Sequence, residues 1–511
     1  MNSKLTITAN LLAATLLTGC GGGGGGGGGS SSPAPATFNV NFVRLANSAT
    51  TANSTCQIFA ETADRKTIGY SAPPADTSGQ AFSVVIHNAD GSVVTTITDI
   101  SASSYRFRQS SVPNGGFVSF VMRSETGSYR ATTFAKDLLP VNLQLGVRSS
   151  AVSTNCIGST AAAENTYKAY IEDTSAQVDY YGFNHYNQDL SNLDSYYNVG
   201  GFIAGGLEFS SINNKRVLIA QYSNGGNNGT RGELGALQAF SLVSLSQISE
   251  DANEPNTLNN GGGTAPTPLT WTAPQDADLT LSSANMFIHE GTTGALLWQP
   301  LSATNATSPF SYASSIGDNN YYVTMEGQYK GWALEGSEQL SAPMYDVSSQ
   351  FATTLPSALG NVTSFTPDVI SCSLADSGSC FTVTDTGQTD NSDTIVRVYH
   401  RVNNTNAQYT LYAHYNTDLP IMSFDGDNES LQDYLSSGNI TDSELSLFTA
   451  DAEESFDSFI YGHNGADDIA RIATATSSFG DAITPLSSTQ QHTEYRDKLK
   501  YQPNTWLSAS F

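Results

Sequence analysis

The sequence has little charge for its length, and positive charge is especially sparse. Only 13% of the 511 residues are charged, with 21 Lys and Arg against 47 Asp and Glu, so the formal net charge is −26. Such a chain repels phosphate backbones and lacks the basic stripe that nucleic-acid binding requires. We therefore expect no nucleic-acid partner, and we interpret the acidity as a solvated exterior that could also attract cations or basic surfaces.

The sequence also lacks the short motifs of common hydrolases. No Gly-x-Ser-x-Gly segment occurs, which excludes the nucleophile elbow of serine hydrolases. Spacing gives no test for glycosidase carboxylates, because the fold brings such pairs together. No two histidines have the His-x-x-x-His spacing of zinc proteases; the seven are His87, His185, His289, His400, His414, His463 and His492. We therefore predict a protein that is not an enzyme and has no catalytic residues and no cofactor.

Long apolar runs are missing as well, and one short run lies at the start of the chain. Met1–Leu17 has a single cation, Lys4, and an apolar stretch too short for a permanent membrane helix. The residues that follow, Leu17-Thr18-Gly19-Cys20, resemble the lipobox of bacterial lipoproteins. That resemblance implies a signal peptide over 1–19 and membrane attachment through acyl chains on Cys20. An ordinary signal peptide with a chance cysteine is the alternative.

The residues after Cys20 suggest a location and a reach for this anchor. Position 21 is glycine rather than the aspartate that often retains such lipoproteins in the inner membrane, so the resemblance implies an outer-membrane address, facing either the periplasm or the exterior. The next residues are nine glycines, Gly21–Gly29, followed by Ser and Pro residues. This stretch has no large apolar side chains that could form a core, and its glycines leave the backbone free. We expect residues 20–36 to be a flexible stalk with a reach of roughly 20–25 Å.

Cysteine is scarce, with five residues in the chain. Four remain after Cys20 is set aside, an even number that suits disulfides in an oxidising compartment. They are Cys56, Cys156, Cys372 and Cys380. Three pairings are possible, and we favour Cys56 with Cys156 and Cys372 with Cys380, because each pair stays within one half of the chain. No pair has the C-x₂-C spacing of a metal site.

Apolar and polar residues alternate along much of the chain after the stalk. The alternation is clear in Phe38–Val43 and Phe117–Met122, and the Asp90-Gly91 and Asn114-Gly115 pairs are typical of turns. This pattern predicts an all-β protein of tandem β-sandwich modules, immunoglobulin-like or fibronectin-like.

Departures from this pattern are expected near the C-terminus. A minor helical region is predicted within 429–459, made of Glu429–Tyr434 and Thr441–Phe459. The second helix would open with a capping box of Thr441 and Glu444. The final residues, Trp506–Phe511, are expected to form a last strand.

Weak internal matches occur in the same order in two stretches of the chain. Ile86-His87, Phe107, Met122 and Gly127–Arg130 match Ile288-His289, Phe310, Met325 and Gly327–Lys330, and further on Ala176-Gln177 and His185–Leu190 match Ala407-Gln408 and His414–Leu419. The shared order predicts a duplicated pair of modules, 37–160 and 161–250, then a Gly/Pro-rich linker 251–268, then 269–365 and 366–511. Histidines that recur in this way are expected to be structural.

Two of the module openings resemble a domain type of bacterial surface proteins. Phe42-Val43-Arg44-Leu45 and Ile395–His400 are similar to strands of uncharacterised domains that open with Val-Arg-Val and continue to an aromatic strand. The usual Ala-Pro turn between those strands is missing here. The resemblance implies a β-sandwich and no particular activity.

An acidic loop is the one candidate cation site. The carboxylates of Asp425, Asp427 and Glu429 alternate in a way that could surround Ca²⁺, although Ser430 and Ser436 replace the glycine and glutamate of an EF-hand. A solvated loop is the alternative. Residues 402–470 hold thirteen Asp or Glu and no Lys or Arg, which could attract a basic partner or a cation-bridged glycan.

Aromatic clusters are the candidate glycan-binding features, because sugar rings stack on exposed aromatic faces. The clusters are Tyr180-Tyr181-Gly182-Phe183, Tyr196-Tyr197 and Tyr321-Tyr322. Adjacent residues of a strand point to opposite faces, so one aromatic residue of each pair is expected in the core.

These features together predict a non-enzymatic outer-membrane or cell-surface lipoprotein with a structural, coating or adhesive role, for example in the sheath of a flagellum. Its partners would be the membrane, through Cys20, and other envelope proteins or glycans. The alternative is a surface lipoprotein that binds or hydrolyses polysaccharide. Two carboxylates about 5–10 Å apart in a deep aromatic-lined cleft would favour that alternative.

Overall fold

A computed structural model describes much of the chain beyond the stalk. The described residues are 35–47, 58–61, 67–74, 81–147, 165–171, 180–185, 207–211, 216–224, 234–340, 359–383, 391–402, 407–415, 418–436, 440–450 and 504–511, with short breaks inside the longer ranges. The signal peptide, Cys20 and residues 21–34 of the predicted stalk lie outside them, as do Cys56 and Cys156. Thr37–Phe511 form one compact unit.

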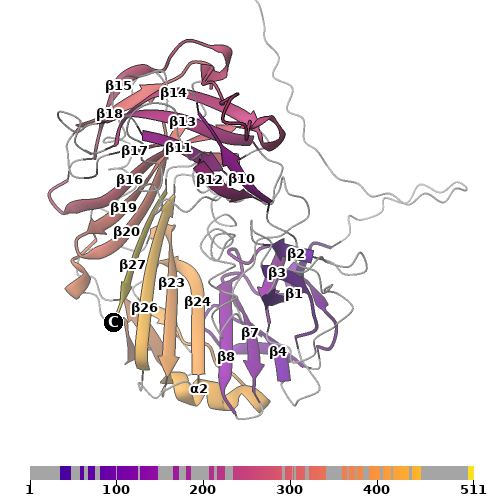
Figure 1. The fold of residues 1–511 in the computed structure, drawn as a ribbon. Coiled ribbons are helices and arrows are strands. Elements are labelled where there is room, and N and C mark those ends of the chain that lie inside the picture. Colours follow the sequence, from indigo (N-terminus) through magenta and orange to yellow (C-terminus); the bar gives the residue numbers. More distant parts are fainter. Residues whose placement is uncertain are drawn as a thin grey trace, which may run out of the picture. The chain divides into compact units, whose positions relative to one another are not determined.

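One sheet of twelve strands contains most of the longer strands (Figure 1). In spatial order these are β17 (Gly294–Leu301), β16 (Leu279–Glu290), β19 (Tyr321–Tyr329), β20 (Trp332–Gln339), β27 (Asn504–Ser510), β26 (Ile440–Ala450), β23 (Asn391–Val402), β24 (Ala407–Tyr415), β8 (Tyr129–Ala135), β7 (Phe117–Arg123), β4 (Ala81–His87) and β5 (Val93–Ile97). Neighbours are antiparallel except β24 and β8, which run parallel. The sheet therefore joins distant parts of the chain, and the predicted C-terminal strand is confirmed as β27.

Smaller sheets accompany the large one. The first contains β2 (Ile58–Glu61), β3 (Thr67–Ser71), β1 (Thr37–Asn47), β6 (Ser104–Arg108) and β9 (Asn142–Gly146). The others are β10 (Asn165–Ala169) with β12 (Leu207–Ser211), β11 (Tyr180–His185) with β13 (Arg216–Asn224) and β14 (Leu234–Ser244), β15 (Thr267–Thr272) with β18 (Thr307–Tyr312), and β21 (Pro367–Ser371) with β22 (Ser379–Val383) and β25 (Asp418–Pro420). The predicted all-β fold of sandwich type is confirmed.

Helices are short in the described part of the chain. They are the 3₁₀ turns η1 (Gln109–Ser111), η3 (Leu245–Gln247), η4 (Asn260–Gly262), η6 (Val362–Ser364) and η8 (Gly426–Asn428), and the α-helix α2 (Glu429–Ser436). None of the described helices is long and apolar enough to cross a membrane. The predicted helix at Glu429–Tyr434 is confirmed as α2, which buries Leu431 and Leu435.

The second predicted helix, Thr441–Phe459, is wrong over its described part, where the chain forms β26 between β23 and β27. Glu444 does not complete a capping box, because its carboxylate accepts a 2.6 Å hydrogen bond from Arg397. A cap is worth about 1 kcal/mol, and pairing on both sides with burial of Leu445 and Leu447 outweighs it. Residues 451–459 lie outside the described residues.

Strands β4, β7 and β8 are buried on both faces, which explains the mostly apolar sequences of β4 and β7. On one face Phe82 of β4 contacts Phe42 of β1, with ring centroids 4.9 Å apart. On the other face His87 contacts Phe424 at 5.5 Å. Phe424 belongs to a stretch that we call the covering segment, Asp418–Ser436. The strands at this end of the large sheet are thus packed between the β1 sheet and the covering segment.

The two predicted turns are confirmed, and their glycines have left-handed backbone conformations that favour glycine. Gly91 has φ 83° in the turn between β4 and β5, and Gly115 has φ 70° before β7. Gly91 also approaches the covering segment closely, because a Cβ atom there would lie 3.2 Å from the carbonyl oxygen of Ile421. A side chain at position 91 would therefore strain both the turn and this contact.

Two parts of the large sheet have the same strand order. We call β5-β4-β7-β8 the first four-strand unit and β17-β16-β19-β20 the second. In each unit the strand that follows the first hairpin leaves for another sheet, as β6 pairs with β1 and β18 pairs with β15. Ile86 pairs with Val118, and its counterpart Ile288 pairs with Tyr321. The separation along the chain between the paired residues therefore differs by one residue in the two units. This agreement supports a duplicated first module, which stays a prediction.

Other parts of the predicted repeat do not occupy matching places. Tyr129 opens β8 and pairs with Arg123, whereas Tyr329 ends β19 and pairs with Trp332. The match of Gly127–Arg130 with Gly327–Lys330 is therefore not a match of equivalent strand positions. In the second module pair, β11, which ends at His185, pairs with β13, whereas β24, which carries His414, pairs with β23 and β8.

The predicted linker 251–268 is closely attached to β14. The Asn260 side chain accepts a hydrogen bond from the Phe240 amide at 3.0 Å, and the Asn259 amide donates to the Ser241 hydroxyl at 2.8 Å. Asn256 accepts from the Ser249 amide at 2.8 Å. This stretch therefore has a defined path, and β15 begins inside it.

Candidate functional site

The predicted pairing of Cys372 with Cys380 is confirmed. The two residues form a disulfide with Cα atoms 5.8 Å apart, in the hairpin of β21 and β22. Cys380 is fully buried. Cys20, Cys56 and Cys156 lie outside the described residues, so their predicted lipid attachment and pairing stay predictions.

The carboxylates of the candidate calcium loop have separate protein partners. Asp425 accepts a 2.5 Å hydrogen bond from the Thr96 hydroxyl of β5, and a carboxylate oxygen of Asp427 lies 3.5 Å from the Arg123 guanidinium. Glu429 is exposed at the start of α2. In the described part of the chain, no group of three or more His, Cys, Asp or Glu side chains is placed to hold a metal ion. Asp425 and Asp427 attach the covering segment to the first four-strand unit.

Other contacts strengthen that attachment. The Asn428 side chain donates a 2.8 Å hydrogen bond to the Ser83 hydroxyl in the interior. The Tyr129 hydroxyl donates to the main-chain carbonyl of Asp427 at 2.9 Å. The Ser423 amide donates to the Gly91 carbonyl, also at 2.9 Å. A buried polar side chain without its partner costs more than an exposed one, so the Asn428 bond fixes the position of the covering segment most strongly.

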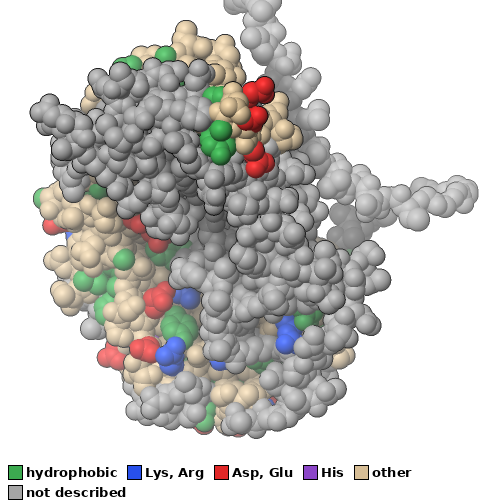
Figure 2. All heavy atoms as spheres, viewed as in Figure 1, with side chains coloured by type: hydrophobic (Ala, Val, Ile, Leu, Met, Phe, Trp, Pro, Cys, Tyr) green, Lys and Arg blue, Asp and Glu red, His purple; other side chains and the backbone are tan. Residues whose placement is uncertain are grey.

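Acidic residues farther along the stretch 402–470 pair with cations of β23. Glu444 forms an ion pair with Arg397 at 2.6 Å, and Asp442 forms one with Arg401 at 2.9 Å. The acidic and basic side chains visible beside one another in Figure 2 illustrate how positive and negative charges mix on this face of the molecule. Part of the predicted acidic face is thus neutralised within the protein.

Tyr321 and Tyr322 are both fully buried, so neither exposes a ring for a sugar. The Tyr321 hydroxyl bonds both the amide and the carbonyl of Ala313, each at 3.0 Å. The Tyr322 ring stacks on Phe287 with centroids 5.5 Å apart. The expectation that only one of the pair lies in the core is wrong because β19 is covered on both faces. The side chains of Tyr180, Tyr181 and Phe183, and all of Tyr196-Tyr197, lie outside the description.

Polar side chains form a buried row across six neighbouring strands of the large sheet. The row consists of His87, Ser119, Thr133, Tyr409, His400 and Ser443. His87 Nε2 lies 2.8 Å from the Ser119 hydroxyl, which lies 2.7 Å from the Thr133 hydroxyl. Tyr409 approaches Thr133 across the parallel junction of β24 and β8, and it pairs in register with His400. His400 Nδ1 lies 2.7 Å from the Ser443 hydroxyl.

Both histidines of this row are held in the neutral form. Burial lowers the pKa of His87 to about 3, against a smaller opposite effect of a backbone hydrogen bond at Gly91. Burial also lowers the pKa of His400 to about 3. Phe381 covers this end of the row, with its ring centroid 4.3 Å from that of His400. These histidines are structural in the fold, as expected for His87, and His400 shares this role although it has no partner in the predicted repeat.

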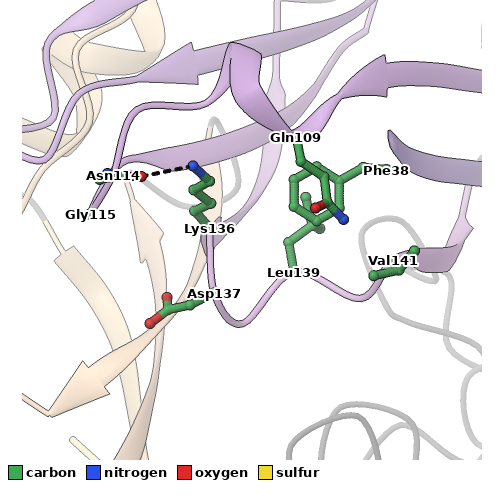
Figure 3. Close-up of a pocket in the computed structure, with 8 residues that line it drawn as sticks. All are labelled: Phe38, Gln109, Asn114, Gly115, Lys136, Asp137, Leu139 and Val141. Carbon is green, nitrogen blue, oxygen red and sulfur yellow. Dashed lines mark hydrogen bonds between the residues drawn. The ribbon is translucent and has the colours of Figure 1, made fainter. Parts of the chain in front are cut away.

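A pocket of about 420 Å³ opens between the β1 sheet and the end of β8. Its lining residues are Phe38, Gln109, Asn114, Gly115, Lys136, Asp137, Leu139 and Val141. Figure 3 shows Lys136 and Asn114 joined on one side of the pocket, and Phe38, Gln109 and Leu139 grouped on the other. The Lys136 ammonium donates to the Val112 carbonyl at 2.7 Å and to Asn114 Oδ1 at 3.2 Å. The sequence patterns did not reveal this pocket, because its residues come from separate turns.

A hydrogen bond between His414 of β24 and Asp137 borders the pocket. His414 Nε2 lies 2.8 Å from a carboxylate oxygen of Asp137, and both side chains are partly exposed. The hydrogen bond from His414 lowers the pKa of Asp137, so this carboxylate stays charged at neutral pH. The side chain of His289 and the whole of His463 and His492 lie outside the description.

Comparison with known proteins adds no assignment, since no protein-family model matches the chain and no curated protein is significantly similar to it.

Proposed function

We propose that this protein is a lipid-anchored envelope protein, attached to the outer membrane through Cys20, whose β-rich body has a structural, coating or adhesive role. The observation that carries the proposal is the sequence Leu17-Thr18-Gly19-Cys20 after a short apolar stretch and before a glycine stalk. Several acyl chains on one residue hold a protein on a membrane, whereas a single chain binds it marginally. The body would then be displayed at the end of the stalk.

The chemistry of four candidate residues in the described part of the body fits a structural role for them. His87 and His400 are buried, neutral and bonded to serine hydroxyls. A general acid or base needs access to substrate and a pKa near the working pH, and these groups have neither. The carboxylates of Asp425 and Asp427 attach one part of the fold to another. A continuous sheet linking both four-strand units suits a protein that supports others.

Replacement of the lipobox cysteine tests this proposal. Cys20→Ala should release the protein from the membrane fraction and abolish incorporation of labelled palmitate. Gly21→Asp is the matched variant: it should keep the label but move the protein toward the inner-membrane fraction. Retention of Cys20→Ala in the outer membrane would contradict the anchor. Protease treatment of intact cells would then distinguish a body that faces the exterior from one that faces the periplasm.

A further inference from the structure

We propose that the pocket beside Lys136 binds a neutral, hydroxyl-rich ligand, the chemical class of uncharged sugar units. Its volume of about 420 Å³ falls within the range of roughly 300–1,000 Å³ usual for small-molecule sites. The lining of the pocket supports this assignment independently of the lipid anchor, so failure of one proposal leaves the other standing.

The polar side of the pocket is built from groups that can both donate and accept. Lys136 uses two of its N–H groups on the Val112 carbonyl and Asn114 Oδ1, and an ammonium has three, so one remains for a ligand oxygen. Asn114 keeps its amide donors, and Gln109 contributes a second side-chain amide. A hydroxyl group donates and accepts at once, and it therefore fits a mixed lining of this kind.

The apolar side of the pocket is fixed by the fold. Phe38 and Leu139 are each 4% exposed, and Val141 is 48% exposed. The Phe38 ring packs on Phe107 with centroids 5.4 Å apart, and the Asn39 amide donates to the Val141 carbonyl at 2.8 Å. A preformed wall lowers the ordering cost of binding. The CH face of a sugar ring would pack mainly on Val141, the exposed residue of this wall, while its hydroxyl groups reach the polar side.

The charges of the lining favour a neutral ligand over a charged one. Lys136 and Asp137 are the one cation and the one anion among the lining residues of the pocket. An anionic ligand would be attracted by Lys136 and repelled by Asp137, and a cationic ligand would meet the reverse, so neither gains much net energy. The hydrogen bond from His414 lowers the pKa of Asp137, so Asp137 keeps the negative charge that offsets Lys136.

An array of short neutral, acidic and amino-sugar oligosaccharides, probed with the purified full chain, tests this proposal. We expect retention on neutral glycans, and about tenfold weaker binding by Asn114→Ala or Gln109→Ala, the usual effect of one lost hydrogen bond. Retention on acidic glycans alone, or on none, would overturn the proposal.

A matched pair of bulky substitutions separates the pocket from general effects. Val141→Trp would fill the pocket mouth and abolish binding. Val94→Trp is the control, because Val94 is 44% exposed on β5 and does not line the pocket. Circular dichroism would verify that both variants fold. Equal loss of binding in both variants, or binding unchanged by Val141→Trp, would place the glycan elsewhere and contradict the assignment.

Discussion

The first and second four-strand units share their strand order and differ in the chemistry of one face. In the first unit Ser119 of β7 belongs to the buried polar row and bonds His87. By register, Tyr322 of β19 has the position of Ser119 and Phe287 of β16 that of Val85, and these two rings stack. The two units therefore share their pattern of strand pairing, whereas the residues on the face of Ser119 and Tyr322 differ between them.

The opposite face of the two units is alike. Ile86 and Ile288 are 1% and 0% exposed, and Met122 and Met325 are 4% and 1% exposed. In each unit the neighbouring small sheet contributes a buried phenylalanine. Similar burial at register-matched positions is what duplication followed by divergence would produce, because the inner face of a sandwich tolerates little change in volume.

The largest expected effect comes from truncating this shared face in both units. Ile86→Ala and Ile288→Ala should each lower the free energy of unfolding by about 2–5 kcal/mol, since each removes a buried side chain and leaves a cavity. Urea unfolding would measure both. Similar losses would support equivalent cores in the two units, and a neutral effect of either variant would contradict them.

A pH effect is expected from the buried polar row, in which His87 belongs to the first unit and His400 lies outside it on β23. The pKa of His87 and of His400 is about 3 in the folded chain, whereas an unfolded histidine titrates near pH 6.5. Stability from these groups is therefore complete above pH 6.5 and is lost as the pH falls toward 3. Each histidine should shift the unfolding equilibrium about tenfold per pH unit in that window.

Unfolding experiments at several pH values would measure this slope. His87→Gln and His400→Asn keep an amide near the bonded ring nitrogen but cannot take up the proton, so each should flatten the slope. His414→Gln is the control, because His414 is partly exposed, and it should change the slope much less. An unchanged slope in both buried variants would contradict the assigned burial.

A smaller loss of stability is expected from removing the Ser119 hydroxyl, which lies between His87 and Thr133. Ser119→Ala removes the partner of both His87 and Thr133 and should cost about 1–3 kcal/mol, because buried polar groups lose their hydrogen bonds. Ser283→Ala of the second unit is the control, since that hydroxyl bonds the exposed Glu326 at 3.2 Å and should cost within about 0.5 kcal/mol. Equal costs in urea unfolding would count against a special role for the row.

The smallest expected effect concerns the attachment of the covering segment. Asp427→Asn should lower stability by less than about 1 kcal/mol, because its pair with Arg123 is 3.5 Å long and Asp427 is 72% exposed. The effect should shrink in high salt. A large loss at low salt that disappears at high salt would show that this ion pair, rather than the buried Asn428 bond, holds the covering segment.

Local features of the fold could be predicted from sequence because their causes are local. The strand at Phe38 follows from alternation, and the strand at Phe117 follows from its β-branched and aromatic residues. The turns at Gly91 and Gly115 follow from glycine's tolerance of positive φ. The pairing of Cys372 with Cys380 could be predicted because the two residues are only 8 positions apart.

Long-range features could not be predicted, because they depend on partners far along the chain. The capping pattern at Thr441 gave no sign that β23 and β27 would flank this segment and make it a strand. The polar row depends on the parallel junction of β8 with β24, whose registers join residues such as Thr133 and Leu411. The pocket beside Lys136 depends in the same way on separate turns that meet in space.

Mass spectrometry of the N-terminal peptide, from protein purified out of membranes, would show whether Cys20 carries the lipid anchor. The lipid-anchor account predicts a mature chain that begins at Cys20, with a mass increased by a diacylglyceryl group on the thiol and an acyl chain on the new amino terminus. A peptide that retains residues 1–19, or an unmodified Cys20, would contradict the account.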